Sequence, residues 1–189
     1  GGVLALRLFN CLKPVIAAVN GPAVGIGATM QLPMDIRIAS DAARFGFVFA
    51  RRGIVPEAAS SWFLPRLVGM SQALEWCYSG RVFGAEEARA GGLVRSVHAP
   101  GELMEAAREI AREIADNAAP VSIALTRQMM WRMAGADHPM QAHRLDSFVI
   151  DRNGNAESLA YCIRRHIVVR GPDAAGFAAR LAEEFLAVL

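Results

Sequence analysis

From Pro14 to Met34 the chain carries no charged side chain, and this segment constrains the possible folds more than any other. It is long enough to cross a bilayer as a helix. Asn20, Gly21, Pro22, Gln31 and Pro33 interrupt it, however, and asparagine, glycine and proline favour turns. The segment therefore predicts a buried strand, a turn and a short buried helix rather than a membrane span.

The composition is that of one domain with a sizeable core. Hydrophobic residues make up 53% of the 189 residues and the mean hydropathy is +0.27, which indicates a large buried interface or a missing partner segment. The net charge is only +2, and the absence of basic runs argues against nucleic-acid binding. Three scattered cysteines and four histidines without metal-ligand spacing predict neither disulfides nor a metal site.

The first residues, "GGVLALRLFN", contain neither a starting methionine nor a signal-peptide pattern. We therefore expect a cytoplasmic protein, and we expect the chain to lack an N-terminal part.

Strands and short helices are predicted for the first half of the chain. The short apolar runs at 14–19 and 35–40 predict buried strands, and the alternating phenylalanines of 44–50 predict a third. A helix is expected over 25–32, and after Pro56 short helices should end at Gly69 and Gly80. "AEEARAGG" predicts one more helix, and "LVRSVH" a short strand.

Helices dominate from Glu102 onward. Three apolar stripes at helical spacing mark their buried faces: Leu103, Ala107, Ile110 and Ile114; Val121, Leu125, Met129 and Met133; and Phe177, Leu181, Phe185 and Val188.

The glycine-rich stretch "GPAVGIGAT" (21–29) has two interpretations. It is not a phosphate-binding P-loop, because no Gly-Lys pair follows, and Met30 stands where a dinucleotide fingerprint needs its last glycine. It is either an oxyanion hole, with a backbone N–H at a helix N-terminus facing a developing negative charge, or a tight strand-to-helix turn in the core.

Glu57 is an isolated acid among small and apolar neighbours. Following Pro56, it is either a first-turn helix acid stabilised by the helix dipole or a catalytic acid/base.

Three segments carry a family resemblance: "KPVIAAVNGPAVGIGATMQLPMDIRIAS", "ARFGFVFARRGIVPEAASSWFLPRLVG" and "YSGRVFGAEEARAGGLVRSV". From Lys13 to His98 the chain resembles the enoyl-CoA hydratase/isomerase family, also called the crotonase family. The resemblance implies an α/β fold with a spiral core of ββα units, truncated at its N-terminus and followed by a helical layer. Residues 1–98 would be the C-terminal part of that core, and residues 99–189 a helical region for core capping and oligomerisation.

The resemblance also implies chemistry and partners. Members act on acyl-CoA thioesters, so coenzyme A belongs to the substrate and no separate cofactor is expected. They form trimers, often stacked as hexamers, and two backbone N–H groups stabilise a thioester enolate. By position, one donor would be the N–H of Ile26, flanked by Gly25 and Gly27 in the substrate site. The other donor normally comes from a segment that would precede residue 1, and the sequence offers no candidate for it.

The resemblance favours an isomerase over a hydratase. The two glutamates of family hydratases correspond to Thr29 and Phe49 here, and neither side chain accepts a proton at neutral pH. "PEAASS" resembles the Δ3,Δ2-enoyl-CoA isomerase branch, in which a single glutamate, here Glu57, moves a proton from C2 to C4. Phe49 and Trp62, with Phe47 and Phe63, would supply an apolar site. An enoyl-CoA hydratase, and a truncated, catalytically silent assembly subunit, remain the alternatives.

Overall fold

The computed structural model describes residues 1–151, which fall into two compact units, 1–118 and 119 onward, each taken by itself. The strands of the first unit are β1 (Ile16–Val19), β2 (Pro22–Val24), β3 (Ile36–Ser40), β4 (Arg44–Gly46), β5 (Val82–Gly84) and β6 (Val97–His98). Its helices are α1 (Gly2–Phe9), α2 (Ile26–Thr29), the 3-10 helix η1 (Ala50–Arg52), α3 (Ser60–Val68), α4 (Met70–Ser79), α5 (Ala85–Ala90) and α6 (Leu103–Asn117). The second unit contributes α7 (Pro120–Met133) and α8 (Pro139–Asp151).

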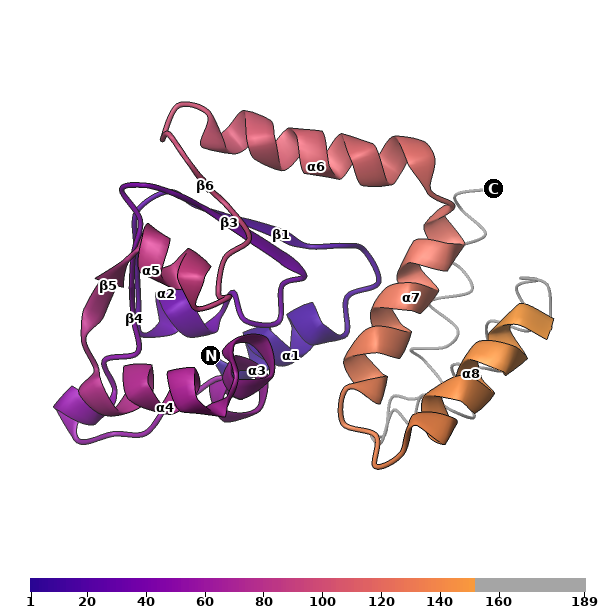
Figure 1. Cartoon of the computed structure of the whole chain (residues 1–189), viewed down its shortest axis with the longest axis horizontal. Helices are drawn as coiled ribbons and strands as arrows, with labels where there is room; N and C mark the ends of the chain where they lie inside the picture. The colour runs from indigo at the N-terminus through magenta and orange to yellow at the C-terminus, as the bar shows by residue number, and fades with distance from the viewer. Residues whose placement is uncertain (152–189) are drawn as a thin grey trace. The chain divides into compact units, whose positions relative to one another are not determined.

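Two three-stranded sheets organise the first unit (Figure 1). One has the order β1-β3-β6 and is parallel throughout, and the other has the order β2-β4-β5 with β5 antiparallel. The chain places β1 in the first sheet and β2 in the second, forms α2, and then repeats this path with β3 and β4. These successive strand–strand–helix turns confirm the predicted mixed α/β spiral.

Helix α6 covers the parallel sheet (Figure 1). Leu103 and Ala107 pack on the fully buried Ile38 of β3, and Ile110 lies at the edge of this cluster. Three members of the first predicted stripe therefore face the sheet. Because α6 packs on these strands, it belongs to the same compact unit, which extends to Ala118.

An aromatic stack forms a second packing centre between β4, β5 and α4. The ring of Trp76 lies 4.3 Å from that of Phe83, which in turn contacts Phe45 at 6.0 Å. Phe47 stacks on Trp76 at 6.2 Å. The predicted strand over 44–50 was too long, because β4 ends at Gly46 and the chain then turns into η1. The alternating phenylalanines are nevertheless all buried.

Several short elements differ from the sequence prediction. Helix α1 and the three-residue strands β2 and β5 were not predicted, because segments this short contain too few residues to display a period. The helix expected over 25–32 is confined to α2, and turns follow it. Pro33 cannot donate a backbone hydrogen bond to a continuing helix. The predicted helix ends at Gly69 and Gly80 are confirmed.

In the second unit, the side chains of the second predicted stripe are half-buried, whereas the most buried residues of α7 are Ala124, Arg127 and Gln128. The third predicted stripe, at 177–188, lies outside the described residues. Within residues 1–151 no helix combines the length and the apolar character needed to cross a membrane.

Candidate active site

The glycine turn connects β2 to α2. Gly25 adopts φ +59° and ψ −121°, a left-handed conformation that side-chain-bearing residues rarely adopt. Its N–H donates to the carbonyl of Gly46 at 2.9 Å, which fixes the turn to the end of β4. A Cβ added at Gly25 or Gly27 would meet no atom within 4 Å. The turn is therefore anchored at its backbone and open at its surface.

The first amide of α2 is available as a donor. The N–H of Ile26 has no acceptor among the residues that the structure describes, as expected for the first turn of a helix. Ile26 is 48% exposed. This part of the turn therefore places an unpaired backbone donor beside open space.

Glu57 lies against the end of the same helix. The hydroxyl of Thr29, the last residue of α2, donates to Oε1 of Glu57 at 2.6 Å. Thr29 is fully buried, while the Glu57 side chain is 38% exposed. The second oxygen, Oε2, lies 3.8 Å from the amino group of Gly1. Ile26 and Glu57, the two residues predicted to be catalytic, are thus linked through α2. Ile26 is the first residue of this helix, and Thr29, its last residue, binds Glu57.

The backbone after Glu57 is strained. Ala58 and Ala59 both have φ of +57°, in the left-handed region that costs a non-glycine residue about 1–2 kcal/mol. The N–H and the hydroxyl of Ser60 both donate to the Glu57 carbonyl, at 3.0 and 2.6 Å. Because α3 begins only at Ser60, the interpretation of Glu57 as a first-turn helix acid is wrong. Strained backbone of this kind concentrates at functional sites.

The aromatic residues expected around Glu57 belong to two different packing clusters. Trp62 packs edge-on against Phe63 at 4.8 Å and Phe9 at 5.8 Å, and the Arg66 guanidinium lies 4.0 Å above its ring. Trp62 and Phe63 are thus part of the contact between α1 and α3. Phe47, by contrast, belongs to the aromatic stack around Trp76.

Phe49 is 6% exposed, and its carbonyl accepts the N–H groups of Arg52 and Ile54. It therefore shapes the η1 turn that leads toward Glu57.

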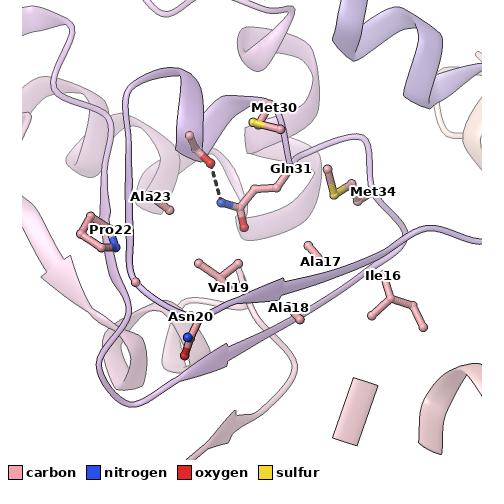
Figure 2. A pocket seen from close by; sticks show the side chains of 12 residues that line it. Ile16, Ala17, Ala18, Val19, Asn20, Pro22, Ala23, Met30, Gln31 and Met34 are labelled. Carbon is pink, nitrogen blue, oxygen red and sulfur yellow. Dashed lines mark hydrogen bonds between the residues drawn. The ribbon is translucent and has the colours of Figure 1, made fainter. Parts of the chain in front are cut away.

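A pocket of about 390 Å³ lies on another side of α2 (Figure 2). It is lined by β1, by the turn at 20–21 and the start of β2, and by Gly27, Met30, Gln31 and Met34. Among the predicted site residues, only Gly27 lines it. Gly27 and Thr29 are two residues apart on a helix and hence about 200° apart around its axis. The pocket and the Thr29–Glu57 contact therefore lie on different sides of α2.

Gln31 is a site feature that sequence reasoning missed. Its Nε2 donates to the Gly27 carbonyl at 2.7 Å, as the dashed line in Figure 2 marks. Its Oε1 is buried without a hydrogen-bond partner among the described residues. The sequence feature that could have indicated this role is a single amide side chain within an otherwise apolar run.

Arg37 fixes the turn that follows α2. Its Nε donates to the Leu93 carbonyl at 2.8 Å, and its guanidinium also donates to the Met34 carbonyl. Burial lowers the pKa of Arg37 to about 10, against the opposing charge of Asp35. Within residues 1–151 no group of three or more His, Cys, Asp or Glu is placed to hold a metal ion.

Comparison with known proteins identifies the class. The profile of the enoyl-CoA hydratase/isomerase family matches residues 3–159. The enoyl-CoA hydratase ACTT3 of Alternaria alternata is 42% identical over 173 residues, which cover 91% of this chain and 58% of that protein. The chain therefore belongs to the enoyl-CoA hydratase/isomerase family, which confirms the resemblance seen in the sequence.

Solved structures of enoyl-CoA hydratases and isomerases also match this chain. A probable enoyl-CoA hydratase/isomerase from Mycobacterium abscessus matches with a TM-score of 0.73 and 37% identity, over 76% of this chain and 58% of that one. A monofunctional enoyl-CoA isomerase from M. smegmatis matches with a TM-score of 0.66 and 35% identity, over 74% of this chain and 65% of that one. The chain thus spans less than two thirds of the length of each of these relatives.

Proposed function

We propose that the protein is an acyl-CoA enzyme that shifts a double bond in an enoyl-CoA thioester, converting a 3-enoyl into a 2-enoyl form. One observation carries the proposal: the Glu57 carboxylate is hydrogen-bonded to Thr29 at the end of α2, the helix that begins at Ile26. The proposed base is thereby anchored to the short helix that carries the proposed oxyanion donor.

The reaction needs one carboxylate and one stabilised oxygen. Glu57 removes a proton from C2 of the substrate, and the electron pair moves onto the thioester oxygen to give an enolate. The N–H of Ile26 donates to that oxygen, and Glu57 then returns the proton to C4. The open space beside Gly25 and Gly27 gives the thioester room to approach.

Hydration is the second candidate, because the Alternaria relative is named an enoyl-CoA hydratase. The side chains argue for isomerisation: at the positions of the two hydratase glutamates, the chain has the Thr29 hydroxyl, which donates to Glu57, and the buried ring of Phe49. Phe49 and Trp62 would act on the acyl group only indirectly, Phe49 through the η1 turn and Trp62 through the contact between α1 and α3. We further propose a cytoplasmic homotrimer or hexamer, assembled through the helical region.

Turnover of 3-enoyl-CoA and 2-enoyl-CoA by wild-type protein and Glu57→Gln tests the proposal. We expect double-bond migration without release of a 3-hydroxyacyl product, and a loss of kcat of about 10²–10⁴-fold in Glu57→Gln. Glu109→Gln, an exposed position on α6, is the matched control and should be neutral. Undiminished isomerisation by Glu57→Gln would reject the mechanism, a hydroxyacyl product would favour the hydratase, and no turnover by a folded chain would favour the silent subunit.

A further inference from the structure

We propose that Thr29 is a positioning residue for Glu57: its hydroxyl holds Oε1, so that Oε2 is the oxygen that carries the transferred proton. This inference rests on the proposed function, since it assigns roles to the two oxygens of the proposed base.

The hydrogen-bond geometry around Thr29 defines the donor. Oγ1 lies 2.6 Å from Glu57 Oε1 and 3.4 Å from the carbonyl oxygen of Ile26. A hydroxyl has one hydrogen to donate, and the shorter contact has the distance of a strong bond to a carboxylate. The Ile26 carbonyl already accepts the N–H of Met30 at 2.9 Å. The Thr29 hydrogen is therefore directed at Glu57.

This bond makes the two carboxylate oxygens inequivalent. Oε1 accepts from Thr29 when Glu57 is ionised, and it can continue to accept when Glu57 is protonated on Oε2. Protonation on Oε1 would instead place two hydrogens between the same two oxygens. The cycle of proton removal from C2 and return to C4 therefore runs through Oε2 and leaves the anchor intact.

The side chain is held at both ends. At the backbone, the N–H and hydroxyl of Ser60 bind the Glu57 carbonyl, and at the carboxylate Thr29 binds Oε1. Thr29 is fully buried and belongs to the turn that starts at Ile26, so the base is fixed relative to the proposed oxyanion donor. Geometry held in this way contributes strongly to rate, since a displacement of about 1 Å can cost 10²-fold.

Three variants test the proposal with the 3-enoyl-CoA assay. Thr29→Val removes the hydroxyl and keeps the shape, Thr29→Ser keeps the hydroxyl, and Thr126→Val makes the same change at an exposed site on α7. In Thr29→Val we expect kcat to fall about 10- to 100-fold, with KM within about twofold. Thr29→Ser should recover most of kcat. Wild-type kcat in Thr29→Val would overturn the proposal.

A second measurement is independent of turnover. In a double-mutant cycle of Thr29→Val and Glu57→Ala, thermal unfolding should show a combined loss in Tm that is smaller than the sum of the single losses. Additive losses would overturn the contact itself, whatever the assay gives. A non-additive cycle together with full activity in Glu57→Gln would reject the proposed function, and with it the positioning role, while leaving the contact as a structural one.

Discussion

The hydroxyl of Thr29 lies 2.6 Å from the carboxylate of Glu57, although the two residues are 28 positions apart in the sequence. The parallel pairing of β2 with β4 brings them together, since Thr29 follows β2 and Glu57 follows β4. The Gly25 N–H reinforces this register through its bond to Gly46. Successive turns of the spiral thus bring Thr29 and Glu57 of the candidate site next to each other.

Replacing Ala59 by glycine should stabilise the protein. Ala59 has φ +57°, a conformation that costs alanine about 1–2 kcal/mol and glycine little, whereas glycine loses about 0.5–1 kcal/mol more backbone entropy on folding. We expect the free energy of unfolding to rise by about 0.5 kcal/mol, measured by urea denaturation. Ala111→Gly, at an exposed position of α6, should lower it by about 1 kcal/mol. Equal losses in the two variants would contradict the left-handed turn beside Glu57.

Gly91→Ala should destabilise the aromatic stack. A Cβ at Gly91 would lie 2.6 Å from Cη2 and 2.8 Å from Cζ2 of Trp76, a fully buried ring. Overpacking of this kind costs about 1–3 kcal/mol, and we expect that loss in the free energy of unfolding. Gly84→Ala is the matched control, because a Cβ there meets no atom within 4 Å and its φ is −87°. Unchanged stability of Gly91→Ala would mean that the Trp76 ring is not held where the structure places it.

The sequence was sufficient to predict the parts of the fold that depend on local pattern. The apolar runs that became β1 and β3 are buried strands, and Gly69 and Gly80 end helices, because period and turn chemistry act within a few residues. The family resemblance correctly gave the spiral. Strands β2 and β5 were missed because each has three residues, and pairing with β4 defines them.

In the candidate site too, the sequence predicted the features that depend on local pattern and missed the contact that depends on strand pairing. Glu57 was selected because it is a lone acid, and the conformation of Gly25 agrees with the expected sharp turn. The Thr29–Glu57 bond could not be derived, because it depends on the register between two turns of the spiral. Nor could the sequence show that Trp62 packs on Phe9 while Phe47 stacks on Trp76, because composition gives no information on which of two clusters a ring joins.

Arg37→Lys should weaken the scaffold under α2. Arg37 is 7% exposed, and its planar guanidinium donates in different directions to the carbonyls of Leu93 and Met34. A lysine carries a point charge that cannot reproduce this fork, and a buried acceptor would lose its donor. We expect a loss of about 2–4 kcal/mol in urea denaturation. Arg95→Lys, at an exposed position, is the control and should not change stability. Equal stability of both variants would show that the two guanidinium hydrogen bonds of Arg37 are dispensable.

Glu87→Gln should change how stability depends on pH. The pKa of Glu87 is lowered from its ordinary value, first by hydrogen bonds from Arg81 and then by the Trp76 indole and the Arg81 charge, against desolvation. The folded state therefore holds the proton less tightly than the unfolded state. The stabilisation is fully present above the unfolded pKa and is lost as pH falls through the folded one.

Thermal unfolding of wild-type protein and Glu87→Gln between pH 7 and pH 3 measures this effect. The Tm difference should be largest near pH 7, at about 2 °C for a half-exposed pair, and should shrink steadily below pH 4.5. Glu113→Gln, on the exposed face of α6, should show no such trend. A carboxyl group with a depressed pKa can only lose stabilisation on acidification. A Tm difference that grows toward low pH would therefore have the opposite pH dependence and would exclude the Arg81–Glu87 bond as its source.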